Sequence, residues 1–168
     1  PHFCISIGLE QAGEMIAGVI YDPLRDELFH AEKGAGAYLN DHRIRVSSRD
    51  KMMESVITTG IPAVGRGRYD EYRAQLSLVM EQTAGIRRMG SAALDLAYVA
   101  AGRFDASIAI GIDDIAGDVG TLLVREAGAM LSTVALGDDQ VATVAAGTRL
   151  ERAVLACLAK SPAIPPVA

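Results

Sequence analysis

The stretch from Gly85 to Ala127 constrains the fold of this chain more than any other. It reads as a strand, a Gly-Ser turn, an Ala-rich helix, a second strand, an acidic turn and a second helix. Strands and helices that alternate in this way are typical of a layered α/β unit. The start of each helix leaves backbone N–H groups without an intrahelical partner, and these groups attract an anion or a side-chain oxygen. The two helix starts, at Gly90–Ser91 and Asp113–Asp114, are therefore the candidate site.

Each helix start has two interpretations. Ser91 and Asp114 are favoured N-cap residues, because their side-chain oxygens accept hydrogen bonds from the first helical N–H groups. A Gly-Ser pair alone is a weak phosphate signal, since it lacks the spaced glycines and the lysine of a P-loop. In the functional interpretation, Gly90 and Ser91 receive a phosphate, and the carboxylates at Asp113 and Asp114 hold a hard cation. The residues alone leave both interpretations open.

Residues 1–62 are predicted to form an antiparallel sheet. Phe3, Ile5 and Ile7 alternate with other residues in the first predicted strand, and a second short apolar run covers residues 15–21. Further strands are predicted at 27–31, 37–39 and 43–46, each bounded by Gly, Pro, Asn or Asp. Short sequential strands joined by such turns are typical of an antiparallel meander.

Residues 63–160 are predicted to form an α/β part. Apolar residues at helical spacing predict helices at 69–82, 91–101, 114–128 and 148–159, with strands at 86–88, 106–110, 130–132 and 141–145 between them. Thr148, followed three residues later by Glu151, predicts a capping box at the last helix. We expect one domain over residues 1–160 and a flexible tail at 161–168, which contains three prolines.

Composition excludes two classes of partner. The formal net charge is −5, so the chain has no excess of positive charge to bind nucleic-acid phosphates, and we expect no nucleic-acid partner. No apolar run reaches the roughly 18 residues of a membrane span. Cys4 and Cys157 lie far apart within apolar runs, which favours reduced core residues in a cytoplasmic protein. A single long-range disulfide is the alternative.

Three segments carry a resemblance to a known family. They are PHFCISIGLEQAGEMIAGVIYDPLRDELFHAEKGAGAYLNDHRIRVS, GSAALDLAYVAAGRFDA and DIAGDVGTLLVREAGA. Together they resemble the inositol monophosphatase family of magnesium-dependent phosphatases, from Pro1 to about Leu158. The resemblance implies an α+β fold, a layered α/β sandwich of the sugar-phosphatase type. It also implies hydrolysis of a small phosphate monoester with Mg²⁺ as cofactor, in a homodimer.

The resemblance also implies site residues. The GSAA helix start contacts the substrate in this family, which here means Gly90, Ser91 and Ala92. The family's metal-binding aspartate in a WDIAAG-like segment corresponds to Asp114. The other metal ligands, a glutamate and the aspartates of a DPLDGT-like motif, precede the position of Pro1. The chain therefore resembles a family member without its N-terminal part, and no residue is assigned as the catalytic base.

Three departures from the family pattern bear on function. Asp113 stands where the family usually has Trp, and the turn between Gly111 and Asp114 is about two residues shorter. Ala109 stands where inositol-cleaving members carry a substrate-binding glutamate. The sequence therefore does not specify which phosphate ester is the substrate. The alternative function is a catalytically silent domain of the same fold with a structural or dimerisation role.

Overall fold

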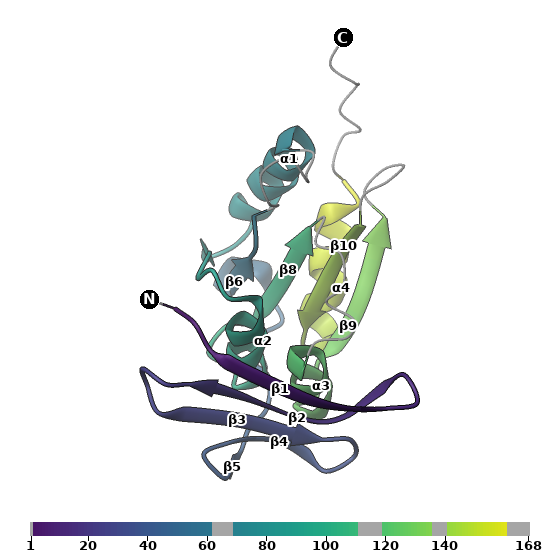
Figure 1. Ribbon diagram of the computed structural model, residues 1–168. Helices are drawn as coiled ribbons and strands as arrows, with labels where there is room; N and C mark the ends of the chain where they lie inside the picture. Colours follow the sequence, from purple (N-terminus) through teal and green to yellow (C-terminus); the bar gives the residue numbers. More distant parts are fainter. Residues whose placement is uncertain (1, 62–68, 111–118, 136–140, 161–168) are drawn as a thin grey trace.

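The computed structural model describes residues 2–61, 69–110, 119–135 and 141–160, and these contain two five-stranded sheets (Figure 1). The first sheet is an antiparallel meander in which the strands follow chain order, as the alternating sequence predicts. Its strands are β1 (Ile5–Gln11), β2 (Glu14–Asp22), β3 (Glu27–Glu32), β4 (Gly36–Leu39) and β5 (His42–Arg43). β1 and β5 are the edges.

The second sheet is mixed and has the order β7-β6-β8-β10-β9. Its strands are β6 (Val56–Thr59), β7 (Gly85–Arg87), β8 (Ala106–Ile110), β9 (Met130–Ala135) and β10 (Val141–Ala146). β6 is parallel to β7 and to β8, whereas β10 is antiparallel to β8 and β9. The prediction that the antiparallel part extends to residue 62 is therefore wrong, because β6 belongs to the second sheet. Three of the four β6 residues are fully buried, as is typical of an internal strand covered on both faces.

The helices complete a layered sandwich. α2 (Ala92–Ala100) and α3 (Val119–Glu126) lie between the two sheets, and α1 (Tyr69–Met80) and α4 (Thr148–Leu158) pack beyond the second sheet (Figure 1). One apolar core joins the first sheet to α2 and α3, and another joins the second sheet to α1 and α4. The predicted α+β sandwich is confirmed. No helix in the described ranges is long and apolar enough to cross a membrane.

Several local predictions need correction. The strand predicted at 43–46 ends at Arg43, because Val46 donates its N–H to Ala127 after α3 instead of pairing within a sheet. The capping box does not form: Gly147 is the N-cap of α4, without a side-chain cap, and Thr148 is the first helical residue. A short 3-10 helix, η1 (Met52–Glu54), precedes β6. The helix start predicted at residue 114 and the tail at 161–168 lie outside the described residues.

The two cysteines are free. Cys157, in α4, is buried in the core as predicted, and burial raises the pKa of its thiol. Cys4 is half-buried, and its sulfur lies 3.7 Å from the hydroxyl oxygen of Ser91. The long-range disulfide is therefore not formed.

Candidate functional site

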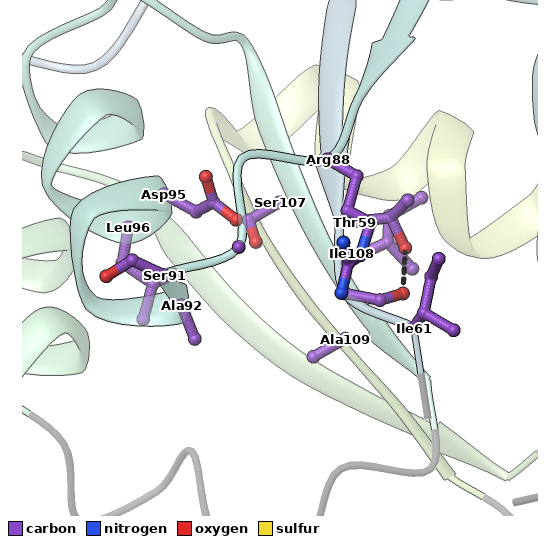
Figure 2. Close-up of a pocket in the computed structure, with 12 residues that line it drawn as sticks. Thr59, Ile61, Arg88, Ser91, Ala92, Asp95, Leu96, Ser107, Ile108 and Ala109 are labelled. Carbon is purple, nitrogen blue, oxygen red and sulfur yellow. Dashed lines mark hydrogen bonds between the residues drawn. The ribbon is translucent and has the colours of Figure 1, made fainter. Parts of the chain in front are cut away.

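A pocket of about 180 Å³ opens where the parallel strands of the second sheet end (Figure 2). The carboxyl ends of parallel strands are where ligands bind in α/β sheets, because connecting loops and helix starts gather there. The lining residues come from the end of β6, the segment after β7, the first turn of α2, and β8. They are Thr59, Gly60, Ile61, Arg88, Gly90, Ser91, Ala92, Asp95, Leu96, Ser107, Ile108 and Ala109.

The start of α2 forms one wall of this pocket. Ser91 is the N-cap, with extended backbone, and its hydroxyl oxygen accepts a hydrogen bond from the N–H of Leu94 at 3.4 Å. Gly90 precedes it with φ of 95°, a left-handed conformation that glycine adopts without strain. The capping interpretation of Ser91 is therefore confirmed, and capping does not exclude a ligand. Gly90, Ser91 and Ala92 border the pocket, and the helix dipole directs partial positive charge toward it.

Arg88 adds a full positive charge to the lining of the same pocket. Arg87 is the last residue of β7 and Arg88 follows it, and only one of two successive residues of an extended segment can face a given side. Arg88 borders the pocket, whereas the Arg87 guanidinium turns back and donates to the carbonyl oxygen of Ile86 at 2.9 Å. Arg88 and the α2 start together favour an anion in this pocket.

Asp95 is the pocket residue that the sequence analysis missed. Its residue is 4% exposed, and Oδ1 has no hydrogen-bond partner in the described part of the chain; the same holds for Oγ1 of Thr58. Burial raises the pKa of Asp95 from its usual 3.8 to about 6, and the Thr58 hydroxyl, as a hydrogen-bond donor, and the Arg88 charge oppose the rise. Thr58 is therefore a candidate donor to Asp95 within the protein, although neither oxygen reaches a partner at hydrogen-bond distance and angle within the described residues. The sequence contains a signal that could have identified Asp95, since it is an acid four residues after Ser91 on an otherwise apolar helix.

The β8 side of the pocket is small and weakly polar. Ser107 and Ala109 both line it, and Figure 2 shows Asp95 projecting from α2 toward the strand that carries Ser107. Ala109 is the position where the resemblance leads us to expect a glutamate in inositol-cleaving members. Its methyl group leaves that wall without a charge, so the acidic group of the described lining is Asp95.

A magnesium site does not fit the described residues alone. Mg²⁺ prefers six oxygen ligands in octahedral geometry and is held by carboxylates and water. Within residues 2–61, 69–110, 119–135 and 141–160, no three His, Cys, Asp or Glu side chains gather into a possible metal site. Asp114, the metal ligand implied by the resemblance, lies outside those ranges.

Comparison with known proteins identifies the family. The model of the inositol monophosphatase family matches residues 1–161. The chain is 46% identical over 165 residues to an inositol-1-monophosphatase of Mesorhizobium japonicum, covering 95% of this chain and 61% of that protein. It is 48% identical over 130 residues to Nus factor SuhB of Xylella fastidiosa, covering 76% of this chain and 48% of that protein.

A solved structure shows the same fold. The extragenic suppressor protein suhB of Bartonella henselae superposes with a TM-score of 0.86 at 41% identity, covering 96% of this chain and 63% of that one. The chain therefore spans about half to three-fifths of the length of the curated relatives that it matches. The match over residues 1–161, the identities above 40% and the shared layers agree, and the chain belongs to the inositol monophosphatase family.

Proposed function

We propose that the protein hydrolyses a small phosphate monoester. The observation that supports this most is the position of the family's GSAA segment: Gly90, Ser91 and Ala92 form the wall of a pocket that favours an anion. The family match and the relative named inositol-1-monophosphatase support the same reaction. We further propose Mg²⁺ as the cofactor and Asp114 as one of its ligands, because the family resemblance implies both.

The described residues of the pocket contribute binding and orientation to this proposal. The α2 start and Arg88 attract the anionic ester, since backbone N–H groups and a guanidinium both stabilise phosphate oxygens. Ala109 adds no charge on the β8 side, so we propose a small hydroxylated phosphate ester without restricting it to inositol. A cytoplasmic protein is proposed from its free cysteines, and a homodimer from the family resemblance.

The second candidate function is binding without catalysis. A relative that shares 48% identity is named a Nus factor, and the described residues hold no cluster of metal ligands. In this alternative the fold serves as a binding or dimerisation domain.

One experiment separates the two candidates. The full-length gene product is incubated with a panel of phosphate monoesters, including inositol 1-phosphate, glycerol 3-phosphate and histidinol phosphate, with Mg²⁺ or with EDTA. The proposed function predicts phosphate release that requires Mg²⁺ and differs among the esters. Absence of release from every ester, by a protein with a cooperative thermal transition, would contradict the phosphatase and favour the binding domain.

A further inference from the structure

Asp95 combines burial, an unpartnered oxygen and a position in the pocket. Within the described ranges, four residues have a buried side-chain polar atom without a hydrogen-bond partner: His2, Thr58, Gln75 and Asp95. Of these, Asp95 lines the pocket beside α2. Buried polar groups in native proteins almost always have a partner, so an unpartnered one in a pocket indicates a ligand or an ordered water.

The polar groups of the pocket are of two kinds. The α2 start and the Arg88 guanidinium supply positive charge, and Asp95 and Ser107 supply hydrogen-bonding oxygens (Figure 2). A carboxylate accepts hydrogen bonds, so the group that satisfies Asp95 carries an O–H or N–H donor. A ligand that contacts both kinds of group has an anionic group and, a few atoms away, a hydrogen-bond donor.

We propose that Asp95 is a specificity-determining residue, which accepts a hydrogen bond from a hydroxyl group of the phosphate ester held by the α2 start and Arg88. The proposal rests on the function proposed above and deepens it, because it names the group that selects hydroxylated esters. The pocket volume of about 180 Å³ is more than ten times the ~10–15 Å³ that one water needs on the same measure, so a short polyol fits.

The expected discrimination follows from the cost of leaving Asp95 unpartnered. A site built to bond a substrate hydroxyl rejects the analogue that lacks it, because the buried acceptor then loses its partner. Glycerol 3-phosphate and n-propyl phosphate form a matched pair, with the same carbon chain and with or without hydroxyls. We expect kcat/KM of the full-length protein with Mg²⁺ to be about tenfold or more higher for glycerol 3-phosphate.

Substitution of Asp95 tests the assignment. Asp95→Leu keeps the approximate volume and removes the acceptor, so the ratio of the two kcat/KM values should fall to within about threefold of unity. Asp95→Asn keeps an acceptor oxygen and should restore much of the ratio. Glu151→Gln is the matched control, because Glu151 is a buried carboxylate of α4 that does not line the pocket, and it should leave the ratio unchanged.

A binding measurement separates this proposal from the proposed function. The thermal shift caused by each of the two esters is measured for the same variants, since a ligand that binds the native state raises Tm without turnover. One outcome supports Asp95 and contradicts the phosphatase. In it, neither ester is hydrolysed, yet glycerol 3-phosphate raises Tm more than n-propyl phosphate does. Asp95→Leu then abolishes this difference in Tm. Equal values for both esters in the wild-type protein, or an unchanged preference in Asp95→Leu with a normal Tm, would overturn the proposal.

Discussion

Buried carboxylates in this chain differ in whether they have partners. Asp22 accepts hydrogen bonds from the N–H of Leu24, the Arg25 guanidinium and the Tyr98 hydroxyl, at 3.0, 3.0 and 3.2 Å. Burial alone would raise the pKa of Asp22, but these bonds outweigh it and the pKa is lowered. Asp95 is equally buried and has Oδ1 unpartnered in the described residues. Asp22 therefore stabilises the fold, whereas Asp95 carries a cost.

That cost predicts how Asp95→Asn changes stability with pH. The pKa of Asp95 is raised from 3.8 to about 6, so between these values the folded state binds more protons than the unfolded state. Wild-type stability therefore falls as pH rises through this window, by at most ~3 kcal/mol. Asn has no charge to bury, so the variant should gain stability over wild type as pH rises from about 3.8 to about 6. Urea unfolding across this range measures the gain.

The comparison of Asp95→Asn with wild type has a control variant and an outcome that would contradict the prediction. Asp41→Asn removes a fully exposed carboxylate and is the control for the loss of a carboxyl charge at the surface. A difference between Asp95→Asn and wild type that is constant with pH would show that Asp95 titrates as an ordinary carboxylate.

Asp114 has two interpretations that one substitution separates. Asp114→Asn preserves capping, because Asn caps a helix about as well as Asp, but it removes the charge that a hard cation requires. A ligand role predicts a normal fold and a loss of Mg²⁺-dependent turnover on the order of a hundredfold or more in the full-length enzyme. A capping role predicts little change in either. Tm and the phosphatase rate at several Mg²⁺ concentrations, measured on one variant, distinguish the two.

At the scale of elements, α3 lies unusually close to its neighbours. A Cβ atom on Gly18 of β2 would lie 2.4 Å from Cγ1 of Val119, and one on Gly120 would lie 2.7 Å from Cδ1 of Leu96 in α2. Glu126, at the end of α3, accepts backbone N–H groups of Gly34 and Gly36 at 2.8 and 2.9 Å. Two glycines and one carboxylate therefore fix α3 between the first sheet and α2.

Gly120→Ala tests this close packing. Alanine favours a helix over glycine by about 1 kcal/mol, so helix propensity alone predicts a more stable protein. The added methyl group would lie 2.9 Å from the Cβ of Leu96, and overpacking of a core costs about 1–3 kcal/mol. We expect a net loss of stability in urea unfolding. Ser77→Ala, at an exposed position of α1, is the control for propensity alone and should be neutral or stabilising.

At the scale of the whole molecule, β1 presents an apolar edge. All seven of its residues are exposed, and β1 is hydrogen-bonded only to β2 within the described sheet. Ile5, Ile7 and Leu9 are 53%, 62% and 58% exposed, whereas a Cβ on Gly8 would contact Val119 of α3. The alternate side chains of β1 therefore form an apolar stripe that faces away from α3. Edge strands with such a stripe tend to pair with another chain.

We expect the 168-residue chain to self-associate through this stripe. Ile7→Lys places a charge at its centre and should shift the sedimentation distribution toward the monomer, since edge lysines oppose strand pairing. Met53→Lys is the matched control, because Met53 is 73% exposed but lies in η1, away from β1. A monomeric wild-type chain with a cooperative melting transition would contradict the prediction, as would equal effects of the two lysines.

Elements whose signals are local were predictable from the sequence. The hairpin of β1 and β2 follows from period-two alternation around a Gly turn, and α2 follows from an Ala-rich run with Ser91 as its cap. The position of Gly90 to Ala92 at a helix start was predictable for the same reason. Each of these depends on residues within a few positions of one another.

The tertiary structure decided what depends on distant partners. Val56 to Thr59 reads as one more strand of the first sheet, and only its pairing with β7 and β8 assigns it to the second. Asp95 lies in a helical pattern, and only the packing of α2 against β8 buries it beside the pocket, with Oδ1 left without a partner in the described residues. Local propensity sets the period of a segment, but which face is buried is set by contacts with segments far away in the chain.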